Sequence, residues 1–174
     1  MGKGRGGRWY TKSMDQDISY HGRLQAAFKL GGRLEQAVEA LGTSFPLDSN
    51  AFDPDQLDLE VSLALDAFRV RFSDLQDILG RSLFPAIARA DEDETPAHVL
   101  TTRERIVLME KRGIVDADKW REIREIRNQF AHEYPDDHEE KAANLNAAWR
   151  LTDELLETNR RILDYARRQH GVVV

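Results

Sequence analysis

Apolar residues recur at spacings of three or four along most of the chain, and this period restricts the fold more than any other feature of the sequence. Such spacing places apolar side chains on one face of an α-helix, whereas a half-buried strand would need strict alternation. No segment shows a convincing strand pattern. The sequence therefore predicts an all-α fold, an up-and-down helical bundle of four long helices plus a short one. The predicted helices cover residues 15–41, 54–79, 102–112, 117–134 and 137–168, with a short continuation at 81–90.

Local signals mark the ends of these helices. Gly42 and Gly113 follow helical segments, and glycine readily adopts the left-handed conformation found just after a helix. Asp116 precedes another helical segment and can cap its first turn. Gly80 is expected to break or bend the second helix. The pair Gly31-Gly32 weakens the first helix and predicts a kink or a close approach of another backbone.

Two apolar stripes identify the core expected from the first half of the chain. On the first helix the stripe consists of Ile18, His21, Leu24, Phe28, Leu34, Val38 and Leu41. On the second it consists of Leu57, Val61, Leu65, Phe68, Phe72, Leu75 and Leu79. We expect both stripes to face the interior of the bundle.

The composition is typical of a folded, soluble protein. Of 174 residues, 41% are hydrophobic and 32% are charged, and the formal net charge is −6. This profile excludes a disordered chain and argues against a protein that coats DNA non-specifically. No segment approaches the roughly 20 apolar residues that span a bilayer. We expect a single domain over residues 14–170, preceded at 1–13 by a flexible basic arm that is either solvated or in contact with nucleic acid.

Several kinds of chemistry are excluded by residues that the sequence lacks. It contains no cysteine, which excludes a disulfide framework, a cysteine nucleophile and a thiolate zinc site. This is compatible with a reducing cytoplasm, where we expect the protein to act, and the first residues lack the apolar segment of a secretory signal. No glycine-rich loop follows a strand, as Walker and Rossmann sites require. The histidines lack the spacing of metal ligands, so we expect neither a metal nor a cofactor.

An apolar stripe divides the polar residues of the predicted helix at 117–134. Arg127 lies at the edge of the stripe, whereas Asn128 and His132 share the opposite side. On an ideal helix Arg127 and His132 are about 140° apart around the axis. They would converge on one substrate only through the reach of arginine, fraying before Pro135, or a second copy of the chain. The stripe consists of Trp120, Ile123, Ile126, Phe130 and Tyr134.

Arginine, asparagine, histidine and tyrosine near one helix end suit the recognition of a phosphate ester. Arginine presents a bidentate cation to phosphate oxygens. Histidine transfers protons near neutral pH, and asparagine can hold a hydroxyl or a base edge. The same residues also fit a surface lattice of ion pairs, in which His132 complements the helix dipole. The residues by themselves leave both interpretations open.

The spacing of Arg127, Asn128, His132 and Tyr134 resembles the R-x4-H-x-Y signature of the HEPN superfamily, and more narrowly that of the HepT-like toxins. The pair Arg71-Phe72 resembles an Arg-Phe pair that members often carry in their second helix. The resemblance covers about residues 55–165. It implies a small helical bundle that forms a homodimer.

The resemblance also implies a function, a metal-independent endoribonuclease that forms the toxin half of a toxin–antitoxin pair. His132 would transfer a proton of the ribose 2′-hydroxyl, and Arg127 would stabilise the phosphorane-like transition state. Asn128 and Arg71 would contact the RNA substrate. Tyr134 matches the hydroxyl that a nucleotidyltransferase-type antitoxin modifies with AMP. Two alternatives stay open, a non-catalytic module that presents a substrate or nucleotide to such a nucleotidyltransferase, and a purely structural helical protein.

Overall fold

A computed structural model of the chain describes residues 8–91, 98–132 and 137–174, with the backbone alone for residues 8–19. The described residues contain helices and no strand, so the all-α prediction is confirmed. The elements are α1 (Arg8–Leu41), η1 (Pro54–Gln56), α2 (Leu59–Asp77), η2 (Ile78–Leu83), α3 (Phe84–Ala90), α4 (Thr102–Lys111), α5 (Ala117–Ala131) and α6 (His138–His170).

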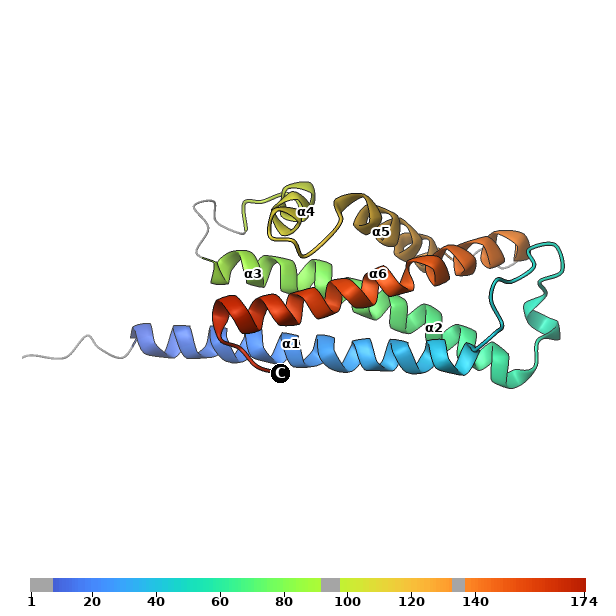
Figure 1. Ribbon diagram of the computed structural model, residues 1–174, viewed down its shortest axis with the longest axis horizontal. Coiled ribbons are helices and arrows are strands. Elements are labelled where there is room, and N and C mark those ends of the chain that lie inside the picture. The colour runs from blue at the N-terminus through green and yellow to red at the C-terminus, as the bar shows by residue number, and fades with distance from the viewer. Residues whose placement is uncertain (1–7, 92–97, 133–136) are drawn as a thin grey trace, which may run out of the picture.

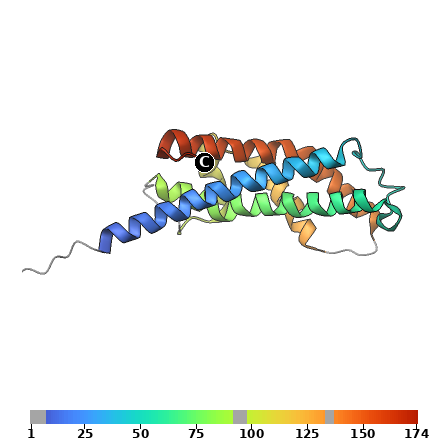
Figure 2. The ribbon, with the colours of Figure 1, turned by 90° about the horizontal axis from the view of Figure 1, so that it is seen from below.

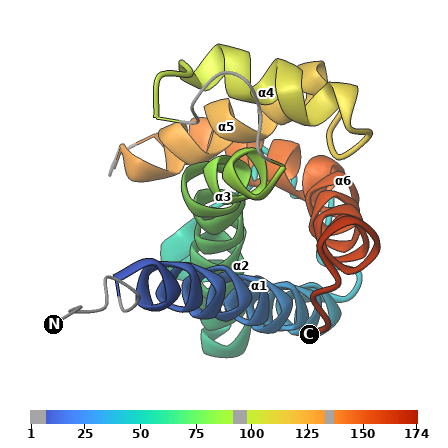
Figure 3. The ribbon, with the colours of Figure 1, turned by 90° about the vertical axis from the view of Figure 1, so that its left-hand side faces the viewer.

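Three long helical runs lie along the long axis of the molecule (Figure 1). They are α1, the run formed by α2, η2 and α3, and α6. In the perpendicular view, α1 crosses between α2 and α6 (Figure 2). Seen from the end, α4 and α5 cover the side of α2–α3 that faces away from α1 (Figure 3). With 15 residues, α5 is about half as long as α1 and α6, which have 34 and 33.

Helix α1 begins earlier than the sequence predicts. The helix begins at Arg8, so residues 8–13 of the expected arm are helical, while residues 1–7 lie outside the described part of the chain. The first turns of α1 extend beyond the ends of the other helices (Figures 1 and 2).

The predicted caps are in place at several helix ends. Gly42 and Gly113 have φ angles of 50° and 69°, in the left-handed region that closes a helix. The Asp116 carboxylate accepts hydrogen bonds of 3.1 Å from the backbone N–H groups of Asp118 and Lys119. These local interactions fix where α5 begins, and so which of its residues reach its far end.

Of the two outcomes expected at Gly80, a break does not occur. The helix continues from α2 through η2, which has a π-helical hydrogen-bond pattern, into α3. A Cβ atom at Gly80 would lie 3.1 Å from Cζ2 of Trp120 and 3.3 Å from Nε2 of Gln76. The glycine therefore makes room for the indole ring rather than ending the helix.

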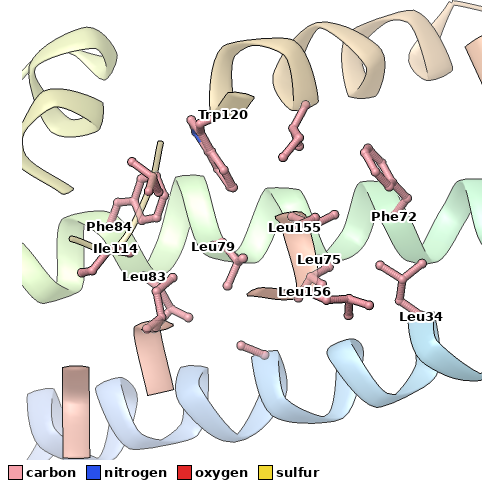
Figure 4. Close-up of a cluster of buried hydrophobic side chains, with 14 of the residues drawn as sticks. Leu34, Phe72, Leu75, Leu79, Leu83, Phe84, Ile114, Trp120, Leu155 and Leu156 are labelled. Carbon is pink, nitrogen blue, oxygen red and sulfur yellow. The ribbon is translucent and has the colours of Figure 1, made fainter. Parts of the chain in front are cut away.

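The core lies where α5 and the three long runs meet (Figure 4). The rings of Trp120 from α5 and Phe84 from α3 pack with their centroids 4.8 Å apart. Leu34 from α1 and Leu155 from α6 are fully buried in the same cluster. Most of the two predicted stripes is buried or packed against this core, with one clear exception.

Phe28 was expected in the stripe of α1, but 58% of it is exposed. The buried positions beside it are Ala27 and Gly31, which are small. Nδ2 of Asn159 on α6 donates to the carbonyl of Ala27 at 3.1 Å. Because α1 meets α6 through these small residues, the bulky neighbour Phe28 is left on the outside.

No helix in the part of the chain that the structure describes combines the length and the apolar character needed to cross a membrane.

Candidate functional site

The stripe of α5 positions the polar residues near its end. Trp120, Ile123 and Ile126 are buried, as predicted. Phe130 is half-buried and its ring meets that of Phe72 edge-on, with centroids 6.0 Å apart. The helix ends at Ala131, after which His132 has extended backbone angles of φ −97° and ψ 113°. Packing on α2 thus fixes the rotation of α5, and the helix end presents His132.

Arg127 forms an ion pair with Asp77, the last residue of α2. Its Nη2 donates to Oδ2 of Asp77 at 2.6 Å, and 20% of its side chain is exposed. Its Nε is buried and has no hydrogen-bond partner in the described residues. Asp77 also lies 3.3 Å from Nε of Arg81, one turn further along the same helical run. Arg127 is therefore anchored through Nη2, and its Nη1 has no hydrogen-bond or ion-pair partner among the described residues.

His132 is exposed, and its ring contacts no hydrogen-bond or ion-pair partner among the described residues. It lines a hollow of about 280 Å³ between the start of α2, the end of α5 and the start of α6, which we call the His132 cavity. Two cations and two carboxylates line this hollow together. The charged groups are Arg69, Lys141, Asp66 and Glu140.

Arg127 and Asn128 line a different hollow, of about 200 Å³, between η2, α4 and α5. We call it the arginine cavity, because four arginines and no carboxylate line it. Its arginines are Arg81 from η2, Arg105 from α4, and Arg124 and Arg127 from α5. In a chain whose net charge is −6, this is a local concentration of positive charge.

The structure brings together some of the residues that the sequence singled out and separates others. Arg127 and Asn128 share the arginine cavity, whereas His132 lines the other hollow. They therefore lie on different surfaces of one chain, and His132 does so from an extended position just after the end of α5. Nη1 of Arg71 donates to the carbonyl of Arg33 on α1 at 2.8 Å, so Arg71 faces α1 and lines neither cavity. Tyr134 lies outside the described residues.

Sequence reasoning missed the partners of Arg127. Arg124 could have been found, because it lies three residues before Arg127 and four before Asn128 on the same helix. No sequence pattern indicates the other partners, since they come from other elements and only packing places them beside α5. These partners are Asp77, Arg81 and Arg105.

Among the residues that the structure describes, no three histidine, aspartate or glutamate side chains gather in a way that could hold a metal ion.

Comparisons with models of protein families, with curated proteins and with solved structures found no match to this chain.

Proposed function

We propose that this chain is a metal-independent endoribonuclease of the HEPN type that acts as a homodimer. The observation that carries the proposal is the presentation of Arg127, Asn128 and His132 at the end of α5. His132 is exposed and without a partner among the described residues, and Arg127 lies beside three further arginines with its Nη1 unpartnered in the same part of the chain. A proton-transfer group and a site for phosphate oxygens are thus carried by one helix.

The reaction needs only the RNA and these side chains. His132 accepts the proton of a ribose 2′-hydroxyl, and the 2′-oxygen attacks the adjacent phosphorus. Arg127 balances the negative charge that develops on the phosphorane-like transition state. The bond from phosphorus to the 5′-oxygen then breaks, and that oxygen takes up a proton. The products are a 2′,3′-cyclic phosphate and a 5′-hydroxyl.

The separation of the two groups within one chain supports a homodimer. Arg127 and His132 line different cavities, so a single copy does not aim both at one phosphate. In a twofold dimer, a surface of one protomer meets the same surface of its partner. Arg127 of one protomer can then act with the histidine of the other, which gives two composite sites per dimer.

Regulation by a nucleotidyltransferase-type antitoxin belongs to the same proposal and rests on the motif position of Tyr134. AMP attached to this hydroxyl would add a phosphate seven residues after Arg127 in the sequence. The added charge and bulk would compete with RNA for the cationic site. The proposal thus makes the protein a toxin whose activity a partner silences by modification.

A non-catalytic binding module is the alternative that the geometry also favours. The separation of His132 from the arginine cavity supports it, because a module that only presents a substrate or nucleotide needs no histidine beside the phosphate. Such a module would bind nucleotide or RNA without cutting it.

Cleavage of a labelled RNA in the presence of EDTA tests the reaction. We expect the wild type to release fragments that end in a 2′,3′-cyclic phosphate, and His132→Ala to lower the rate by at least about 100-fold. His132 is exposed, so its removal should leave the fold intact. His21→Ala, which removes a half-exposed histidine of α1, is the matched control and should cleave at the wild-type rate. RNA that binds the wild type but stays intact would instead support the binding module.

Mixing two inactive variants tests the composite site. A dimer of one His132→Ala protomer and one Arg127→Ala protomer contains one intact site and one that lacks both groups. With random exchange of protomers, about a quarter of the wild-type activity should return. A mixture as inactive as the separate variants would show that each site takes both groups from one protomer.

A further inference from the structure

The arginine cavity shares Arg127 and Asn128 with the proposed cleavage site, and it also has features of a binding site that the cleavage reaction does not require. Its floor is apolar and buried, formed by Phe84, Ile106 and Trp120. Exposed side chains stand at its rim, among them Arg81 and Asn128. A ligand would therefore enter from the rim and place its polar end among the guanidinium groups.

The positive charge of the cavity is only partly neutralised within the chain. Asp77 contacts two of the four arginines, Arg127 at 2.6 Å and Arg81 at 3.3 Å. Arg105 donates through Nε and Nη2 to the uncharged carbonyl of Leu100, at 3.2 and 2.9 Å. Arg124 has no hydrogen-bond or ion-pair partner in the described part of the chain. One carboxylate thus stands against four cations, which leaves a local charge of about +3.

A buried amide provides a second, independent indication of a ligand. Gln76 is 4% exposed, yet its side chain lines the cavity and has no hydrogen-bond partner among the described residues. An amide that lines a cavity without a protein partner can hydrogen-bond to water or to a ligand there. The Nε of Arg127 is likewise buried and unpartnered. The amide of Gln76 can therefore donate to a ligand in the cavity, whereas the Nε of Arg127 is closed off from solvent.

The backbone around the cavity is shaped to keep it open. Gln76, Gly80 and Arg81 come from the end of α2 and from η2, where the π-helical turn widens the helix. Such turns occur often at functional sites. Because Gly80 has no side chain, the ring of Trp120 packs directly against the helix there.

We infer that the arginine cavity binds a phosphate monoester, either the phosphate of a free nucleotide or the terminal phosphate of an RNA strand. A monoester carries a charge of about −1.5 to −2 near neutral pH, which matches the excess cations better than the single charge of a diester. Its terminal oxygens are acceptors for the guanidinium groups of Arg105, Arg124 and Arg127 and for the amide of Gln76. The volume of about 200 Å³ admits a phosphate group with part of its sugar.

Calorimetric titration of the wild type tests this inference, with inorganic phosphate, AMP and adenosine as separate ligands. We expect phosphate and AMP to bind and adenosine to give no signal, because the phosphate group supplies the interaction. Binding of adenosine as tight as that of AMP, or no binding of either phosphate compound, would overturn the inference.

Substitutions in the cavity assign the binding to it. Arg124→Gln should weaken AMP binding by about tenfold or more, since it removes a charge-assisted hydrogen bond. Arg121→Gln is the matched control, because it removes the same charge one turn away on α5, where the guanidinium is paired with Asp118 outside the cavity. Equal losses in both variants would show a general charge effect and contradict the assignment. Gln76→Met keeps the volume of the side chain and should weaken binding several-fold through the loss of the amide.

Two RNA strands of one sequence, with a 5′-phosphate or a 5′-hydroxyl, distinguish the two sources of the phosphate. Tighter binding of the phosphorylated strand, with AMP as competitor, identifies a strand end, whereas equal binding of the strands identifies a free nucleotide. The titrations use His132→Ala, which should not cleave RNA. Phosphate binding that survives in this variant would show that the cavity binds phosphate without His132, so that failure of the cleavage proposal leaves the binding proposal standing.

Discussion

The carboxylate of Asp77 holds two arginines that differ in their surroundings. Arg127 is 20% exposed and meets Oδ2 of Asp77 in a hydrogen bond of 2.6 Å. Arg81 is 68% exposed and lies 3.3 Å from Oδ1, which accepts no hydrogen bond in the described residues. Charged contacts in partly buried places contribute more to stability than exposed ones, because water and salt screen them less.

Replacing these arginines one at a time should separate the two contributions. Arg127→Gln should lower the free energy of unfolding by about 1–2 kcal/mol, since it removes a charge-assisted hydrogen bond to a half-buried carboxylate. Arg81→Gln should lower it by less than about 0.5 kcal/mol. Urea unfolding of both variants beside the wild type measures the difference. Equal losses in the free energy of unfolding would mean that Asp77 interacts equally strongly with both arginines. The result also shows how much of any loss of activity in an Arg127 variant comes from its lower stability.

At the scale of the helical elements, adjacent glycines of α1 have opposite surroundings. A Cβ atom at Gly31 would lie 2.5 Å from Nδ2 of Asn159, whereas nothing lies within 4 Å of one at Gly32. The Asn159 amide is buried and fixed by its hydrogen bond to the carbonyl of Ala27. The sequence indicated a kink or a close approach at this pair. The structure shows a close approach, made by a side chain of α6 rather than by a backbone.

Alanine at each glycine should therefore change stability in opposite directions. Gly32→Ala should raise the free energy of unfolding by about 0.5–1 kcal/mol, because alanine favours the helix. Gly31→Ala should lower it by about 1 kcal/mol or more, because the methyl group displaces the Asn159 amide and costs more than the helix gains. Thermal unfolding followed by circular dichroism provides the comparison. Stabilisation by both substitutions would show that α1 and α6 can move apart at no cost.

At the scale of the whole molecule, a polar network on Asp91 connects segments that are far apart in the sequence. Asp91, just after α3, accepts hydrogen bonds from Tyr165 at 3.1 Å and from Arg112 at the end of α4, and lies 2.7 Å from Nε2 of His170. Nδ1 of His170 is 2.9 Å from the hydroxyl of Tyr20 on α1. One carboxylate thus joins the end of α6 to three other elements.

This network predicts a loss of stability in alkaline solution. Burial, with the nearby Asp91 and Tyr165 adding to it, raises the pKa of Tyr20 well above its ordinary value of about 10. The unfolded chain therefore loses this proton at a lower pH than the folded one, and stability falls as pH rises above about 10, by at most about 1.4 kcal/mol per pH unit.

Tyr20→Phe removes the ionisable group and should flatten this dependence. The variant also loses the contact with His170, so it should be less stable than the wild type by about 1 kcal/mol at pH 8. Urea unfolding at pH 9 and at pH 11 measures how much the free energy of unfolding falls between these pH values. This fall should be smaller in the variant than in the wild type. Parallel curves for the two proteins would exclude Tyr20 as the source.

The sequence by itself determined the features that depend on near neighbours. Helix positions, the caps at Asp116 and Gly113, and the buried face of α5 follow from contacts within about four residues, which the period and the turn residues encode. The separation of Arg127 from His132 is of the same kind, since Arg127 lies on α5 and His132 directly follows it.

Only the tertiary structure decided what faces each helix. Phe28 is exposed because α6 meets α1 through smaller residues, and Gly80 continues a helix because Trp120 packs on it. The arginine cavity joins residues from α2, η2, α3, α4 and α5 that are up to 52 positions apart, from Gln76 to Asn128. No local pattern contains such a grouping, because it arises from the way amphipathic surfaces pack against one another.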